Sequence, residues 1–153
     1  MALRFTLFLI LNFGALLLGG LFTNSGVNSE WYSHLNQAPW TPPGWVFGAA
    51  WTTIMLCFTW YMAIAVGRTT DSRKLIALFS IQWILNVAWN PIFFYFHQVG
   101  FGLIVISLLA LIIALILSLF KSQMKRFSLL VLPYFIWLII ATSLNAYIFF
   151  HPN

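Results

Sequence analysis

Five long apolar stretches constrain this chain more than any other feature of its sequence. Each is close to the ~20 residues that an α-helix needs to cross the hydrocarbon core of a bilayer. The stretches are continuous and rich in Leu and Ile, whereas the strands of a membrane β-barrel alternate apolar and polar residues. We therefore predict five transmembrane helices, over residues 5–22, 45–66, 75–96, 101–120 and 127–150.

The composition excludes a soluble protein. Only 6% of the 153 residues are charged and 62% are hydrophobic, whereas about 25% of the residues of an average soluble domain are charged. Five spans with short connections use up the whole chain. The sequence thus predicts an all-α fold, a five-helix transmembrane bundle in one domain over residues 1–153, with the lipid bilayer as its main partner.

The basic residues all fall in connections that would lie on one side of such a bundle. Arg4 precedes the first span, and the other six lie within residues 68–74 and 121–126. The opposite side has no Lys or Arg. Because these residues collect on the cytoplasmic side of membrane spans, we predict a cytoplasmic N-terminus and an external C-terminus. The net charge of +5 is then a topology signal, and we expect no nucleic-acid partner.

The first connection, residues 23–44, is long, aromatic and rich in proline. It contains Trp31, Tyr32 and Trp40, together with Pro39 and the Pro42-Pro43 pair. One interpretation is an aromatic belt at the membrane interface. The other, which we favour, is a folded lid over the mouth of the bundle. Proline fixes φ and lowers the entropic cost of ordering such a loop.

Polar side chains at helical spacing mark the interior of the third stretch. Gln82, Asn86 and Asn90 follow i, i+4 and i+8 and therefore lie on one face. Pro91 removes a backbone hydrogen bond, so we expect a kink there. Amides in lipid often hydrogen-bond between helices. They can also serve as the few polar groups of an aromatic-walled pocket.

Two further stretches add side chains suited to such a pocket. These are Trp51 and Met55 in the second span and Tyr134, Trp137, Ala141 and Asn145 in the fifth. Together with the stiff first connection, they favour the pocket interpretation over amide bridges alone.

Small residues recur at positions where helices could approach closely. We expect these seams to pack inside the bundle, with a homodimer interface as the alternative. They comprise Ala15 and Gly19 in the first span and Ser107, Ala110, Ala114 and Ser118 in the fourth.

Missing residue types narrow the function. No ionisable side chain lies in the middle of any span, which argues against an ion-coupled transporter. Cys57 has no evident histidine beside it, and no hydrolase constellation is visible. His34, His97 and His151 are scattered near the outer side, which favours interfacial polar groups over metal ligands. We expect no metal and no required cofactor.

Three motifs on three different segments resemble the translocator protein family (TspO/MBR, tryptophan-rich sensory proteins). The similarity covers nearly the whole chain in order and spacing. The motifs are Trp31-Tyr32-x-x-Leu35 followed by Trp40-x-Pro42-Pro43-Gly44-Trp45, then Asn86-x-x-Trp89-x-Pro91-x-Phe93-Phe94, and finally Pro133-Tyr134-x-x-Trp137-x-x-x-Ala141-x-x-Leu144-Asn145.

This resemblance implies a five-helix bundle, often dimeric, that binds tetrapyrroles such as protoporphyrin IX or haem. It also implies binding of flat synthetic ligands of the isoquinoline and benzodiazepine types, between the helices and beneath the first loop. Carried over by motif, the ligand-binding residues would be Tyr32, Pro42, Trp51, Met55, Asn86, Trp89, Trp137 and Ala141.

Two departures from the family pattern affect the expected ligand. The family usually has Lys-Pro before the second loop tryptophan, where this chain has Gln37-Ala38-Pro39. Porphyrin carboxylates would therefore lack a cationic partner on that side. Neither Tyr134 nor Tyr147 is followed by the Lys or Arg of the cholesterol pattern, so we expect no cholesterol site of that kind.

We therefore expect a membrane receptor or sensor that binds tetrapyrroles and other flat aromatic molecules. One alternative is an enzyme that degrades porphyrin in light, although no acid–base pair indicates ordinary catalysis. Another is a facilitative porphyrin transporter.

Overall fold

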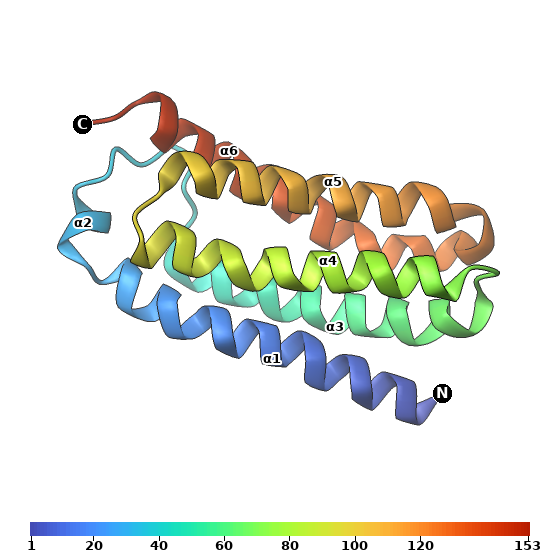
Figure 1. Ribbon diagram of the computed structural model, residues 1–153. Coiled ribbons are helices and arrows are strands. Elements are labelled where there is room, and N and C mark those ends of the chain that lie inside the picture. The colour runs from blue at the N-terminus through green and yellow to red at the C-terminus, as the bar shows by residue number, and fades with distance from the viewer.

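The computed structural model describes residues 1–153, and five long helices make up most of it (Figure 1). Three short helical segments, α2 (Glu30–Ser33), η1 (Pro91–Tyr95) and η2 (Lys125–Val131), connect or extend them. The prediction of an all-α bundle with five spans is confirmed. The long helices are α1 (Ala2–Val27), α3 (Gly44–Arg68), α4 (Ser72–Asn90), α5 (Val99–Met124) and α6 (Leu132–Phe150).

Four helical stretches are long and apolar enough to cross a membrane. The last of them, Val99–Phe150, is 52 residues long and contains both α5 and α6. The chain reverses at Lys125, whose φ is 49°, so α5 and α6 lie antiparallel (Figure 1). Every long helix therefore runs against its sequence neighbour.

The first helix ends later than its apolar pattern predicts, at Val27 instead of residue 22. Polar side chains in this last part hydrogen-bond to the helix itself: the Thr23 hydroxyl lies 3.1 Å from the Gly19 carbonyl oxygen, and Ser25 Oγ lies 3.1 Å from the Phe22 carbonyl oxygen. Such back-bonding lets Ser and Thr remain in a helix. The first connection is correspondingly shorter than expected.

At Pro91, where we expected a kink, the helix changes type and does not end. The backbone continues as the π-helical segment η1, in which the Phe96 N–H donates to the Pro91 carbonyl at 2.9 Å. The wider turn accommodates the residue that cannot donate a hydrogen bond. As a result, Phe93 and Phe94 are buried beneath the first connection.

The core is centred on α3, which contacts all four other long helices. Phe58 is fully buried there and meets Tyr134 of α6 edge-on, with ring centroids 5.3 Å apart. The Tyr134 hydroxyl donates to Gln82 Oε1 of α4 at 3.0 Å. Gln82 therefore links two helices, which agrees with the first of the two interpretations of the polar side chains at Gln82, Asn86 and Asn90.

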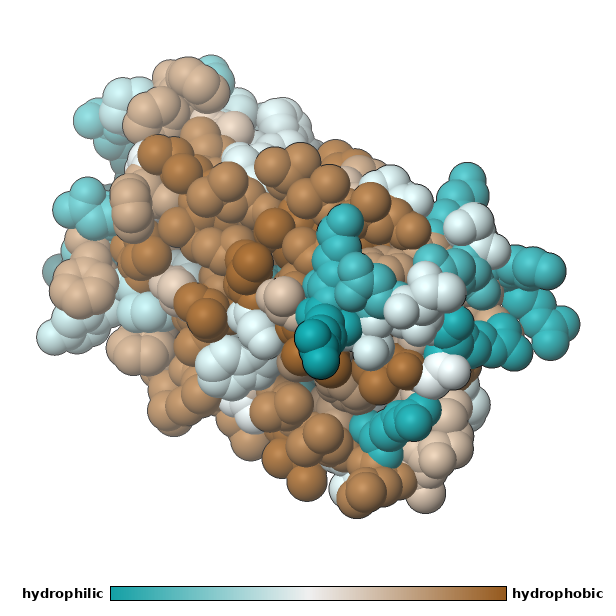
Figure 2. Space-filling model, turned by 45° about the vertical axis from the view of Figure 1, so that its right-hand side comes forward, coloured by the Kyte–Doolittle hydropathy of each residue, from teal (hydrophilic) through white to brown (hydrophobic).

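The outer surface separates into an apolar flank and a polar end. Figure 2 shows hydrophobic side chains over the flank and hydrophilic ones towards both ends, most densely at the right of the view. Large apolar side chains on α1 are well exposed, including Leu3 at 83% and Leu17 at 73%. An apolar flank of this kind is what a lipid-facing bundle presents.

The polar end carries all seven basic residues. The N-terminus and the α3–α4 and α5–α6 connections lie together there, whereas α2 and the C-terminus lie at the opposite end (Figure 1). Arg4 contacts Gly67 at the end of α3. The predicted separation of basic residues onto one side of the bundle is therefore present in the fold.

The two small-residue seams have different surroundings. On α1, Ala15 and Gly19 are buried, and a Cβ at position 19 would lie 2.5 Å from Asn90 Nδ2 of α4. This seam packs inside the bundle, as expected. On α5, Ser107 and Ser118 are exposed.

Candidate ligand-binding cavity

The first connection folds across one end of the bundle and is held there by aromatic contacts. Trp31 stacks on His97 at 4.1 Å and meets Phe93 at 5.5 Å, while Tyr32 contacts Phe94 at 5.6 Å. These ring contacts tie the connection to η1 and to the turn that follows it. The prediction of a folded lid is confirmed for this part of the connection.

The end of the connection is anchored to α6. The Trp40 indole donates to Ser143 Oγ at 3.1 Å, and its ring meets Tyr147 edge-on at 5.3 Å. Trp45, by contrast, is 75% exposed, which is typical of an interfacial aromatic residue. Each of the two interpretations of the loop tryptophans therefore applies to different residues.

A cavity of about 550 Å³ lies beneath this lid, between α1, α3, α4 and η1. This volume is within the range of small-molecule sites in proteins. Aromatic rings form a large part of its lining: Tyr32, Phe47, Trp51, Trp89 and Phe94.

Missing side chains create much of the space. A Cβ at Gly20, Gly44 or Gly48 would have no other heavy atom within 4 Å, and all three glycines line the cavity. They come from α1 and the first turns of α3. The cavity thus lies where two neighbouring helices carry glycine on facing sides.

The polar groups of the cavity are uncharged. Asn90 is already engaged, because it accepts from the Thr23 hydroxyl at 2.7 Å and donates to the Asn86 carbonyl at 3.0 Å. The side-chain amide of Asn86 has no hydrogen-bond partner within the protein and lines the cavity. No Lys, Arg, His, Asp or Glu contributes to the lining.

Two aromatic residues of the lining, Tyr32 and Trp89, carry polar groups whose protonation or hydrogen bonding the structure defines. Burial raises the pKa of Tyr32 above its ordinary value of 10.0 because it penalises the phenolate. Its hydroxyl is therefore a neutral donor at physiological pH. The Trp89 indole donates to Asn145 Oδ1 of α6 at 3.2 Å, which fixes the plane of a ring that a flat ligand would meet.

The fold brings together five of the eight side chains predicted to bind a ligand. Tyr32, Pro42, Trp51, Asn86 and Trp89 all line this cavity. They come from the lid, α3 and α4. Their convergence depends on the loop folding back over the bundle.

The other three predicted residues, Met55, Trp137 and Ala141, do not line this cavity. Met55 is only 1% exposed and lies one turn deeper in α3. Trp137 packs behind the lining, edge-on to Phe47 at 5.3 Å. Ala141 packs against the central core. The reason is the position of the cavity, which is bounded by α1 and not by α6.

The contribution of α1 to the lining was missed from the sequence. This helix supplies a continuous strip of the wall, including Leu16, Gly20 and Asn24. One signal in the sequence was the small-residue seam at Ala15 and Gly19, which indicates close packing. Adjacent glycines on an apolar helix could also have indicated an open space.

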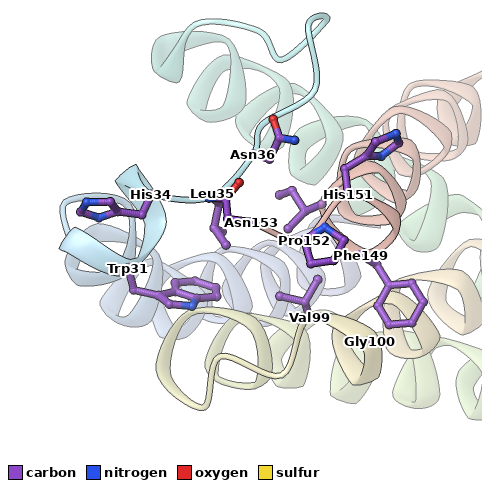
Figure 3. A pocket seen from close by; sticks show the side chains of 11 residues that line it. Trp31, His34, Leu35, Asn36, Val99, Gly100, Phe149, His151, Pro152 and Asn153 are labelled. Atoms are coloured by element: carbon purple, nitrogen blue, oxygen red, sulfur yellow. The ribbon is translucent and has the colours of Figure 1, made fainter.

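A second cleft of about 520 Å³ lies at the same end, between the lid and the C-terminal tail (Figure 3). Trp31 and Leu35 form one side, and Phe149, Pro152 and Asn153 the other. His34 and His151 point away from each other (Figure 3). We favour the inner cavity as the ligand site because it holds five of the predicted residues and this cleft holds none.

Together, the membrane-spanning fold and the cavity beneath its lid define a polytopic membrane helix bundle with an interior space of ligand size. The chain matches the TspO/MBR family over residues 5–151. It belongs to this family of membrane sensors and translocators, and the family resemblance of its three motifs is thereby confirmed.

Curated relatives come from distant organisms. The chain is 33% identical over 116 residues to a tryptophan-rich sensory protein of Cereibacter sphaeroides, covering 76% of this chain and 73% of that one. It is 36% identical over 130 residues to the tryptophan-rich protein TspO of Archaeoglobus fulgidus, covering 83% and 82%. Against the human translocator protein the identity is 30% over 130 residues, covering 78% and 73%.

Proposed function

We propose that this protein is a membrane receptor or sensor that binds tetrapyrroles and other flat aromatic molecules in the cavity beneath its lid. The observation that carries the proposal is the lining itself. It combines two indole rings, Trp51 and Trp89, with the unpaired amide of Asn86 in about 550 Å³. A pocket of apolar walls with a few placed polar groups is typical of small-molecule sites.

The chemistry of the cavity favours ring stacking over charge pairing. Aromatic side chains bury large areas against a flat ligand and orient it through their ring geometry. The carboxylates of a porphyrin would have no cationic partner in this lining, so they must stay in contact with water. Protoporphyrin IX is therefore expected to bind with its apolar edge inside, and neutral flat ligands are expected to bind without this restriction.

A titration with protoporphyrin IX in the dark tests the proposal. The purified protein in detergent is followed by tryptophan fluorescence, with Gly48→Leu as the variant. A leucine at this open position fills the cavity, so saturable quenching should be lost or strongly weakened. Gly14→Leu is the matched control, because position 14 is also open but lies outside the cavity.

Either of two results would contradict the proposal. One is linear quenching equal to that of an unrelated membrane protein, which means partitioning into the micelle. The other is equal weakening by both leucine substitutions, which means a general loss of structure. The same samples under lamp light report whether bound porphyrin is degraded, which separates a sensor from a light-dependent enzyme.

The orientation in the membrane is a second part of the proposal. With all seven Lys and Arg at one end of the bundle, the positive-inside rule places the N-terminus in the cytoplasm and the lid and C-terminus outside. In a Cys57→Ala background, an impermeant maleimide applied to intact bacterial cells should label Asn153→Cys and not Ser122→Cys. The reverse labelling pattern would contradict this orientation.

A homodimer remains a prediction. Of the two small-residue seams, only that of α5 keeps exposed members, Ser107 and Ser118. Crosslinking of Ser107→Cys across two copies in the membrane would support an interface there, and a monomer in native mass spectrometry from mild detergent would contradict it.

A further inference from the structure

A third cleft, far from the lid, lies where α5 turns into α6. It measures about 490 Å³ and lies at the basic end of the bundle. The chain reversal at Lys125 brings Lys125 and Arg126 beside Lys121 in the last turn of α5. All three line the cleft, and Leu132 and Phe135 of α6 form part of its apolar wall.

The cations of this cleft have no acidic partner. The whole chain has two acidic residues. Glu30 lies in α2 at the opposite end, and the Asp71 carboxylate accepts the Lys74 backbone N–H at 3.0 Å as a helix cap. No ion pair joins either carboxylate to these cations, and with seven basic residues at this end against one acidic residue, Asp71, the cleft keeps a net positive surrounding.

A further cation strengthens the positive field. The guanidinium groups of Arg68 and Arg126 lie 4.7 Å and 5.3 Å from the centroid of the Phe127 ring. Arg68 comes from the end of α3, so a second helix brings a cation to the same ring that Arg126 contacts. An anion is the chemical complement of this arrangement.

An unpaired hydroxyl inside the cleft points to a specific ligand atom. Ser128 is 6% exposed, and its Oγ is buried without any hydrogen-bond partner. Buried polar groups are nearly always paired, and one that is not requires an explanation. Ser128 lines the cleft together with the three cations, so its hydroxyl can donate to an anionic oxygen bound there.

We propose that this cleft binds the phosphodiester headgroup of an anionic membrane phospholipid. Lys121, Lys125 and Arg126 neutralise the phosphate, and Ser128 donates to one of its oxygens. The acyl chains then follow the apolar wall formed by Leu132 and Phe135. Basic pockets between helices at the cytoplasmic surface are suited to such headgroups, and the apolar wall favours a lipid over a soluble phosphate.

The positive-inside rule alone does not account for these features. Topology requires basic residues at this end, and Arg4, Arg73 and Lys74 serve that purpose equally well. It requires neither a cleft nor a buried, unpaired hydroxyl. The two explanations therefore predict different results when charges are removed from different places at the same end.

The test compares phosphatidylglycerol with phosphatidylcholine of identical acyl chains, each added to the delipidated full-length protein in detergent. Native mass spectrometry gives the apparent affinity of each lipid. We expect phosphatidylglycerol to bind at least tenfold more tightly. The triple variant Lys121→Gln/Lys125→Gln/Arg126→Gln should lose roughly a hundredfold, because each cation near an anionic lipid contributes roughly fivefold.

Two further variants make the test specific to the cleft. The control Arg4→Gln/Arg73→Gln/Lys74→Gln removes the same net charge from the same end and should keep the wild-type preference. Ser128→Ala changes no charge and should weaken phosphatidylglycerol binding roughly tenfold or more, through loss of a hydrogen bond to a charged group. Ser128→Ala also decides the question if the triple variant does not fold.

Three outcomes would overturn the proposal. The first is equal binding of the two lipids. The second is an equal loss in both triple variants, which would mean general surface charge. The third is equal binding of glycerophosphoglycerol, the headgroup without acyl chains, which would assign the cleft to a soluble phosphodiester. None of these measurements depends on the ligand of the cavity beneath the lid.

Discussion

Asn145 holds the indole of Trp89 from the opposite side of the bundle. Its Oδ1 accepts the Trp89 N–H at 3.2 Å, and its Nδ2 donates to the Val99 carbonyl at 3.0 Å. One buried amide in α6 therefore joins the cavity wall on α4 to the first turn of α5. Although α6 lines no part of the cavity, it positions a ring that does.

Replacing this amide should destabilise the protein and loosen the cavity wall. Asn145→Ala leaves the Trp89 N–H without its acceptor and removes the side-chain donor to the Val99 carbonyl, which should cost about 1 kcal/mol for each interhelical hydrogen bond lost. Thermal unfolding in detergent should show a lower midpoint. Asn153→Ala in the exposed tail is the control, and equal midpoints for the two variants would refute the role of Asn145.

Substitutions of two tryptophans can show whether the ligand binds in the observed cavity or in the wider site that the motifs imply. Trp51 lines the cavity, whereas Trp137 lies behind Phe47 with its indole N–H buried and unpaired. Trp51→Phe should weaken a flat aromatic ligand roughly two- to tenfold through lost ring contact. Trp137→Phe removes an unpaired donor and should leave the affinity unchanged.

This comparison needs a readout that does not depend on the tryptophans themselves. The absorbance shift of the bound ligand serves for both variants. A larger loss with Trp137→Phe than with Trp51→Phe would mean that the ligand occupies a site next to α6, as the family motifs imply.

The lid position occupied by lysine in the family pattern offers a gain-of-affinity test. Gln37 lines the cavity and is exposed. Gln37→Lys should bring a cation to the carboxylates of protoporphyrin IX and tighten binding roughly two- to fivefold, the range of an exposed ion pair. A neutral flat ligand should not respond, and the gain should disappear at high salt. Equal gains for both ligands would indicate a change in lid packing.

Two buried tyrosines differ in whether their hydroxyl has a partner. Tyr134 donates to Gln82 Oε1 at 3.0 Å, whereas the Tyr61 hydroxyl is buried and unpaired. Tyr134→Phe should lower the free energy of unfolding by about 1 kcal/mol and leave Gln82 without its donor. Tyr61→Phe should be neutral or stabilising. Comparing both midpoints in the same detergent checks this, and a larger loss for Tyr61→Phe would contradict it.

The membrane fold was predictable because hydrophobic length and charge position are local properties of the sequence. Residues 45–66 and 75–96 were placed within a few residues of α3 and of α4 with η1. The end of α1 was missed because Thr23 and Ser25 look like loop residues. Their hydroxyls instead bond to the helix backbone, a local choice that composition does not reveal.

The candidate site was predictable only in part, because a cavity is a property of several helices at once. Asn86 and Trp89 could be chosen from one helical face, and Trp51 from its motif. Trp137 is equally aromatic and equally prominent in its motif, yet it faces the core. Which side of α3 remains unfilled depends on how closely α1 and α6 approach it, and that distance is not encoded in either helix alone.

The glycines of the cavity wall also bear on how this protein can change over evolutionary time. Gly20, Gly44 and Gly48 each leave room for a side chain, and one nucleotide substitution converts a glycine codon into one for alanine, valine, serine or arginine. Each such substitution would change the shape of the cavity or place a charge in it, while the fold of the bundle stays the same. A single mutation at one of these glycines can therefore change which ligand the protein prefers, and no such change requires a new fold.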